Sequence, residues 1–105
     1  MAYSKAHFFD PLTYNQSFWS KALSHPARII ILKYLLDHGI TPFYVFAKII
    51  PLARPTISQH LRILRQAGLI DSFEMYPNTY YQLNFNTCKD LALKIKSLNK
   101  SFLEA

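Results

Sequence analysis

Side chains suited to nucleic-acid contact gather in one stretch near the middle of this 105-residue chain. Ser58, Gln59 and Arg62 recur at spacings that place them on one side of a helix. Gln and Ser both donate and accept hydrogen bonds, as base edges require, and Arg attracts phosphate. No acidic residue lies between Asp37 and Asp71. An acid-free stretch of this kind indicates a polyanion partner, although any globular domain can carry a solvated polar helix face.

The helix that positions these side chains is predicted to span residues 55–67. Pro55 suits the first turn, where its missing N–H would have had no partner, and Gly68 suits a left-handed cap after the last turn. The apolar positions share one narrow arc, which we expect to face the core: Ile57, Leu61 and Leu64. The polar side chains then face outward.

The composition suits one small basic domain. Half of the residues are hydrophobic, and twelve Lys and Arg against six Asp and Glu give a net charge of +6. Cys88 is the only cysteine, which excludes an intrachain disulfide. No apolar run is long enough to span a membrane, and residues 1–10 lack a signal-peptide core. We therefore expect a cytoplasmic protein without a membrane partner.

Two helices are predicted ahead of the acid-free stretch. Residues 1–9 are interpreted as an N-terminal arm, and the domain is predicted to span residues 10–105. A capped proline start indicates a helix from residue 11 to about residue 23, and residues 26–37 form the next. The continuous apolar run from Ile29 to Leu32 predicts that this second helix is buried on more than one side.

Residues 41–51 are predicted to form a short helix that turns directly into the helix at 55–67. Thr41 and Pro42 resemble a cap followed by a proline start, and Pro51 ends the helix. Two short helices joined by a tight turn, the second with a polar outer face, make a helix-turn-helix.

The pattern changes to strand-like alternation after Gly68, and residues 70–84 are predicted to form a two-stranded hairpin, or wing. Tyr76 to Thr79 is the expected turn. Asn78 then lies at the tip, which holds no Lys or Arg, so the wing is a weak phosphate clamp.

Residues 87–103 are predicted to form the last helix, with Asn86 or Thr87 as its cap. An apolar stripe runs along it: Leu91, Ile95, Leu98 and Phe102. This stripe can pack on its own domain or pair with a second copy, and we favour pairing. The fold class predicted is mainly α with a small β-hairpin, a winged helix-turn-helix in the order α-α-α-α-β-β-α.

With these elements in this order, the chain resembles the ArsR/SmtB family of bacterial winged-helix repressors. The segments ALSHPARIIIL (residues 22–32) and ISQHLRILRQAGLI (residues 57–70) carry the resemblance, which spans roughly residues 17–103. The resemblance implies homodimers that pair through their first and last helices. It also implies that they bind palindromic operators in double-stranded DNA, repress transcription and are released by an inducer.

The resemblance implies a DNA-facing set of residues: Arg54, Thr56, Ser58, Gln59, His60 and Arg62. Arg65 and the wing-tip Asn78 are added as further candidate DNA contacts. His60 lies on the flank of the core stripe, so a structural histidine is an equal alternative. The candidate dimer interface combines residues of the first and last helices: Leu12, Trp19, Leu91, Ile95, Leu98 and Phe102.

Metal-sensing members of this family hold thiolates on the helix before the recognition helix, or Asp, His and Glu on the last helix. The thiol positions fall on Pro42 and Tyr44 here, and the last helix carries Asp90 and Glu104 but no histidine. Zinc needs about four converging ligands, and the four histidines of this chain are scattered. We therefore predict no metal site and no cofactor.

Two features leave alternatives open. Cys88 lies near a helix N-terminus, which could lower its pKa and make it reactive. The alternative is an ordinary half-buried cysteine, and we favour this alternative. Four aromatic side chains could surround an apolar cavity for an unknown inducer: Trp19, Phe43, Tyr44 and Phe46. The alternative is that they form a packed core, and we favour this alternative.

The leading hypothesis is a dimeric, sequence-specific DNA-binding regulator, a repressor without the known metal sites of the family. The alternative is a winged-helix protein-interaction module with weak or no specific DNA binding, which Glu74 and the uncharged wing tip favour. No enzyme is expected, because the chain has no glycine-rich phosphate loop, no paired carboxylates and no plausible Ser/His/Asp arrangement.

Overall fold

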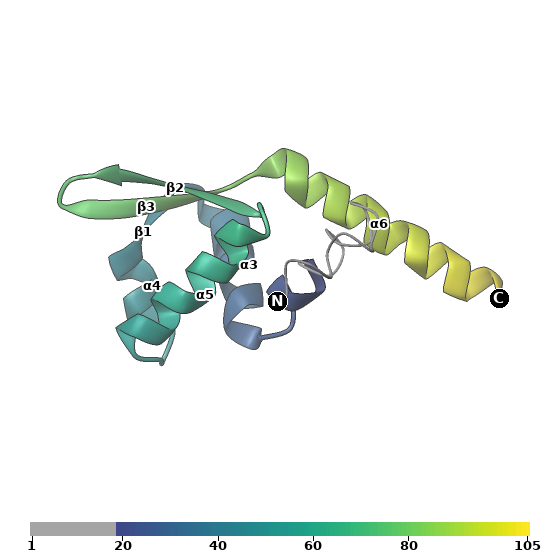
Figure 1. Ribbon diagram of the computed structural model, residues 1–105, viewed down its shortest axis with the longest axis horizontal. Helices are drawn as coiled ribbons and strands as arrows, with labels where there is room; N and C mark the ends of the chain where they lie inside the picture. The colour runs from purple at the N-terminus through teal and green to yellow at the C-terminus, as the bar shows by residue number, and fades with distance from the viewer. Residues whose placement is uncertain (1–18) are drawn as a thin grey trace, which may run out of the picture.

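The computed structural model describes residues 19–105 (Figure 1). Residues 19–22 form a helical turn. The elements that follow are α3 (Pro26–His38), β1 (Thr41–Pro42), α4 (Phe43–Ile49), α5 (Arg54–Gln66), β2 (Ile70–Met75), β3 (Asn78–Leu83) and α6 (Phe85–Glu104). The predicted fold class, mainly helical with a winged helix-turn-helix, is confirmed. The predicted ends of α5 and α6 are shifted by one or two residues.

The sheet has three strands in the order β1-β3-β2, one more than the predicted hairpin. Thr41 was predicted to cap a helix, and this was wrong: Thr41 and Pro42 pair with Tyr81 and Tyr80 of β3. The helix therefore begins at Phe43. The Thr41 side chain is buried, and its hydroxyl donates to the Gly39 carbonyl over 2.9 Å.

The hairpin turn is shorter than the sequence indicates. Met75 pairs with Asn78, so only Tyr76 and Pro77 connect the two strands. Asn78 is the first residue of β3, and Phe73 stacks on Tyr80 across the hairpin at 5.7 Å between ring centroids. The wing is thus a regular two-stranded ladder over six residue pairs.

The core lies between α3, α4, α5 and the sheet. The predicted apolar arc of α5 is confirmed, since all three of its residues are at most 1% exposed: Ile57, Leu61 and Leu64. Phe46 of α4 is fully buried and meets Tyr34 and Tyr81 edge to face. The aromatic residues therefore include a packed core around Phe46, whereas Tyr44 is 46% exposed.

Helix α3 buries one side only, so the prediction that it is buried on several sides was wrong. Ile31 and Leu35 are buried, whereas Ile29 and Ile30 are 36% and 45% exposed. The helix packs on α5 and β3 through a single face, and its apolar run continues around to the solvent side. Gly39, with φ of 75°, ends the helix.

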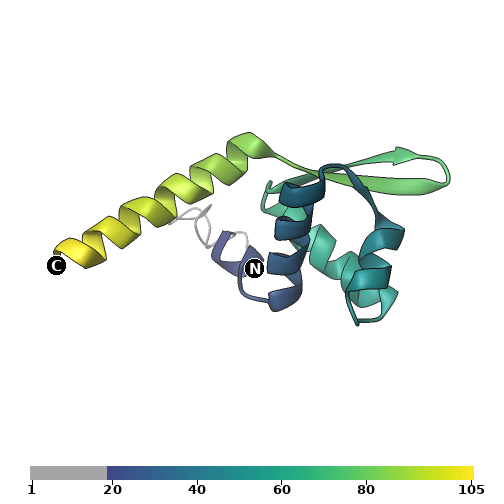
Figure 2. The same cartoon turned by 180° about the vertical axis from the view of Figure 1, so that it is seen from behind.

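Helix α6 leaves the globular body and projects away from it (Figures 1 and 2). None of its residues is buried. Asn84 caps it, because the Asn84 side-chain oxygen accepts from the Thr87 N–H over 3.2 Å, so the predicted cap at Asn86 or Thr87 was wrong. No helix within residues 19–105 is long and apolar enough to cross a membrane.

Candidate nucleic-acid interface

The ends of α5 fix its position against the core. Ala53 precedes it, Pro55 lies in the first turn, and neither a capping side chain nor an acidic residue neutralises the positive end of the helix dipole. At the other end, the N–H groups of Gly68 and Leu69 bond to the carbonyls of Arg65 and Leu64 over 2.9 and 3.1 Å. This is a Schellman cap, and Gly68 has the left-handed φ of 76° that such a cap requires.

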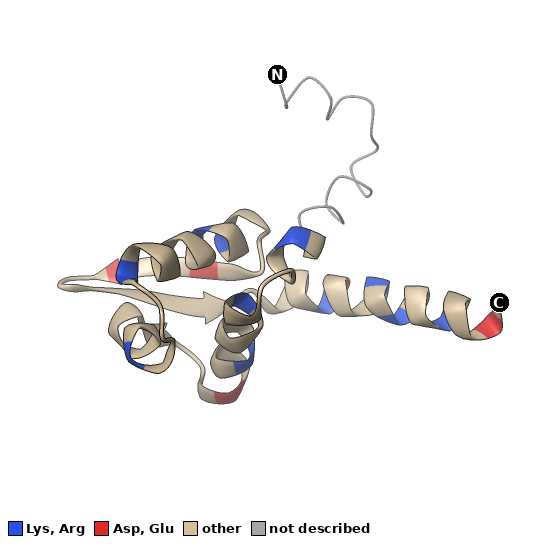
Figure 3. Ribbon diagram, turned by 90° about the horizontal axis from the view of Figure 1, so that it is seen from below, with Lys and Arg blue, Asp and Glu red and all other residues tan. Residues whose placement is uncertain are grey.

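The outer face of α5 carries exposed polar and cationic side chains: Arg54, Thr56, Ser58, Gln59, Arg62, Arg65 and Gln66. Figure 3 shows arginine but no acidic residue on this helix. Because the apolar arc anchors the opposite face, these groups are presented together on a rigid element. The predicted outward orientation of this face is confirmed.

Arg54 and Arg65 lie at opposite ends of this face and have different surroundings. The Arg54 guanidinium lies 6.0 Å from the centroid of the Phe43 ring. Arg65 donates from Nη1 to the Ser72 hydroxyl over 3.2 Å, so it connects α5 to the wing strand. Both guanidinium groups remain exposed and can meet phosphate.

The wing tip differs from the face of α5. Asn78 is half-buried at the first pair of the ladder, and Tyr76 beside it is 99% exposed. Tyr76 was predicted to lie in the turn, where an exposed side chain is ordinary, but was not singled out as a candidate contact. Asp71 and Glu74 are exposed on β2, so the wing carries negative charge that α5 lacks.

His60 does not belong to the exposed face, which favours its structural alternative over a DNA contact. Its side chain is only 7% exposed, and its Nδ1 accepts a hydrogen bond from Arg28 Nε over 3.1 Å. Arg28, itself 8% exposed, also donates to the Lys21 carbonyl and to the Ser24 hydroxyl. The structural alternative for His60 therefore fits the structure.

His25 completes this buried cluster. Its ring lies 4.3 Å from that of His60, and its Nδ1 accepts from the Ala27 N–H over 3.0 Å, which caps α3. Burial lowers the pKa of His60 below its ordinary value of 6.5, and the charges of His25 and Arg28 lower it further. The neutral form of His60 is thus the one that accepts from Arg28 and holds α3 against α5.

The candidate dimer residues fall into three groups. Leu12 lies outside the described residues. Trp19 is 8% exposed and belongs to the core of the single chain. On α6, Leu91 is half-buried, and the other three members of the stripe are 46–73% exposed: Ile95, Leu98 and Phe102. The stripe is therefore available to a partner surface.

Cys88 has the ordinary character that was favoured for it. It is half-buried, and its thiol donates to the Leu69 carbonyl with a sulfur–oxygen distance of 3.4 Å. Burial raises the pKa of the Cys88 thiol, so the alternative of a lowered pKa was wrong. Within residues 19–105, no three His, Cys, Asp or Glu side chains converge as metal ligands would.

The fold and this site define a winged helix-turn-helix protein, and comparison with known proteins gives its family. Residues 25–72 match the family described as bacterial regulatory protein, arsR family. This match confirms the resemblance of the chain to the ArsR family of transcription regulators. Members of this family bind DNA and are not enzymes.

Two relatives and one solved structure illustrate the similarity. The chain is 33% identical over 63 residues to the biofilm growth-associated repressor of Agrobacterium fabrum, covering 60% of this chain and 53% of that protein. It is 42% identical over 52 residues to an uncharacterised HTH-type transcriptional regulator of Methanocaldococcus jannaschii, covering 50% of this chain and 54% of that protein. The chain thus spans about half the length of both relatives.

The solved structure is that of a possible transcriptional regulator for arsenical resistance. It is 27% identical to this chain, superposes with a TM-score of 0.69, and the match covers 81% of this chain and 93% of that one. The similarity therefore extends well beyond the helix-turn-helix and includes most of the described fold.

Proposed function

We propose that this protein is a homodimeric, sequence-specific DNA-binding repressor that acts in the cytoplasm on a palindromic operator. The observation that carries the proposal is the outer face of α5, which combines exposed guanidinium groups, amides and hydroxyls without an acid. The repressor name of the Agrobacterium relative supports the direction of regulation. In this proposal α5 enters the major groove.

The residues divide into two proposed roles. Ser58 and Gln59, on the outer side of the helix, are proposed to read base edges. The remaining exposed candidates are proposed to contact phosphate or sugar: Arg54, Thr56, Arg62, Arg65 and Asn78. Pairing of two copies, through the α6 stripe together with Leu12 and Trp19, would present two such helices to the two half-sites of a palindrome.

Regulation by metal is not part of the proposal. Pro42 and Tyr44 occupy the thiol positions of the metal-sensing relatives, and neither supplies a soft ligand. We propose an organic inducer instead, because an apolar cavity lies between α3 and α6.

The first experiment uses the full chain to select operators from a pool of random duplex DNA. The second measures sedimentation of the protein, alone and bound to the selected DNA, to count the chains in the complex. Recovery of a two-fold symmetric sequence, bound by two chains, would support the proposal. Failure to enrich any sequence would favour the alternative, a protein-interaction module, for which the exposed acids Asp71 and Glu74 on the wing argue.

A further inference from the structure

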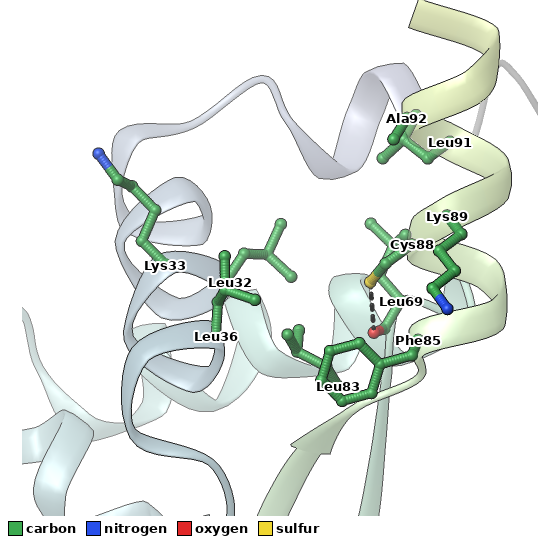
Figure 4. Close-up of a pocket in the computed structure, with 10 residues that line it drawn as sticks. All are labelled: Leu32, Lys33, Leu36, Leu69, Leu83, Phe85, Cys88, Lys89, Leu91 and Ala92. Carbon is green, nitrogen blue, oxygen red and sulfur yellow. Dashed lines mark hydrogen bonds between the residues drawn. The ribbon is translucent and has the colours of Figure 1, made fainter.

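An apolar cavity of about 330 Å³ lies between α3 and the first half of α6 (Figure 4). Leu69, which is fully buried, contributes to its wall, and Leu32 and Leu36 of α3 lie opposite Cys88 and Leu91 of α6. Small-molecule sites typically occupy about 300–1,000 Å³ and are mostly apolar. The cavity therefore has the size and the lining of a site for a small organic molecule.

The rim of the cavity remains open to water. Leu36 and Phe85 are 64% and 56% exposed, although both line the same cavity. The free energy falls when an apolar ligand covers apolar surface that two elements expose to water. The rim thus favours an occupant with an apolar body.

The charged groups that line the cavity are both cationic. Lys89 lines the cavity from α6, and Lys33 lines it from α3 while the Lys33 amine points away (Figure 4). Among residues 19–105, no acidic side chain lines this cavity. An ammonium group at the mouth of an apolar cavity complements a ligand with an anionic head group.

This surface differs from the stripe proposed for dimer pairing. At about 100° per residue, Phe85, Cys88, Lys89 and Ala92 are centred roughly a quarter turn around α6 from Ile95, Leu98 and Phe102. Leu91 lies in the middle of the stripe and also lines the cavity, so the two surfaces share this residue. Apart from Leu91, the ligand site and the stripe use different residues of α6.

We propose that the cavity binds an amphipathic organic anion, an apolar chain with a carboxylate head group, and that this ligand regulates DNA binding. The chain lies on Leu69 between α3 and α6, and the carboxylate pairs with Lys89. Leu69 directly follows the cap of α5, and Leu83 at the end of the wing also lines the cavity. A ligand there would contact residues next to both the end of α5 and the start of α6. The regulatory part rests on the proposed function, whereas binding itself does not.

Cys88 provides a reporter, because the only thiol of the chain lines the cavity. We would measure the rate at which iodoacetamide alkylates the full chain, by intact mass, with increasing decanoate, decanol or decyltrimethylammonium. The proposal predicts saturable protection by decanoate, weaker protection by decanol, and the least by the cation. Protection that is absent or equal for all three would overturn it. Protection that grows with protein concentration alone would show that a second copy covers the cavity, which would also overturn it.

Charge reversal sharpens the test. Lys89→Glu should weaken decanoate protection about fivefold and leave decanol protection unchanged, since only the charged head group loses a partner. Lys96→Glu is the matched control, because Lys96 is also exposed on α6 but does not line this cavity, and it should leave both unchanged. Equal effects of the two variants would contradict a defined carboxylate site. These measurements contain no DNA, so their failure is distinct from a failure of the proposed repressor function.

Discussion

The recognition helix α5 and the C-terminal helix α6 are both amphipathic, but only α5 has its apolar face covered. Leu61 of α5 is 1% exposed, whereas Leu98 of α6 is 59% exposed. The position of α5 is therefore fixed by contacts within the chain. The stripe of α6 still exposes apolar surface that a second copy would bury, since leaving such surface in water is unfavourable. In the proposed repressor, DNA reading and assembly therefore use separate helices of this small domain.

Matched leucine truncations test this difference most severely. Leu61→Ala should lower the free energy of unfolding by about 2–5 kcal/mol at every protein concentration, because it opens a cavity in a packed core. Leu98→Ala should cost about 0.5 kcal/mol or less in dilute protein, where its side chain is exposed. Its cost should grow in concentrated protein, where the stripe is paired. Urea titrations at two concentrations measure both, and equal losses in dilute protein would contradict the comparison.

Substitutions on the outer face of α5 test the proposed division between base and phosphate contacts. Gln59→Ala should reduce discrimination between the operator and a mismatched duplex by about 1–3 kcal/mol. Arg62→Ala should weaken all sequences alike and reduce the salt slope by about one phosphate. Lys96→Ala on α6 is the matched control for loss of an exposed cation. A change of preferred operator in Arg62→Ala would instead assign Arg62 to base reading.

The His60–Arg28 contact predicts acid sensitivity of the α5 packing. The folded-state pKa of His60 lies below its unfolded value, so the unfolded chain binds the proton more readily. Stability should be complete above pH of about 6.5 and fall as the pH drops toward the lower folded-state pKa, with a loss of about 1–2 kcal/mol once the hydrogen bond breaks.

His60→Asn separates this contribution from other titrations, because an amide oxygen can still accept from Arg28 and does not titrate in this range. Urea midpoints between about pH 8 and about pH 5 should fall less in this variant than in the parent protein. His38→Asn, at the exposed end of α3, should retain the full fall. An unchanged acid dependence in His60→Asn would remove His60 as its source.

The smallest effect is expected at the start of α6. Asn84→Ala removes the side chain that accepts from the Thr87 N–H and should cost about 1 kcal/mol. The measurement is amide hydrogen exchange, which should increase in the first turn of α6 and remain unchanged in α5. Faster exchange throughout α5 would show that the two helices are not energetically separate.

Local signals predicted the recognition helix well. The proline start, the Gly68 cap and the apolar arc of Ile57, Leu61 and Leu64 all belong to one short segment, so the sequence contains the information that fixes them. The outward orientation of Ser58, Gln59 and Arg62 follows from the same arc. This part of the candidate site could therefore be placed before the structure.

The predictions that were wrong involve contacts between distant segments. Thr41 and Pro42 resemble a helix start, yet they form a strand because β3, about forty residues later, pairs with them. His60 is buried by Arg28 from α3, which no local pattern indicates. The cavity between α3 and α6 was also missed, because its two walls are brought together only by the fold.

The central claim, that α5 makes this chain a sequence-selective DNA-binding repressor, is tested most directly by fluorescence anisotropy. The duplex is the DNA upstream of its own gene, measured in two salt concentrations with a chelator present throughout. The account predicts that the protein binds this duplex more tightly than random DNA and that the chelator does not change the affinity. It also predicts that a plot of log K against log salt concentration falls with a slope of about 0.9 per phosphate contact. An affinity no higher than the affinity for random DNA would contradict this claim. Binding that requires added metal would contradict the prediction that the protein has no metal site.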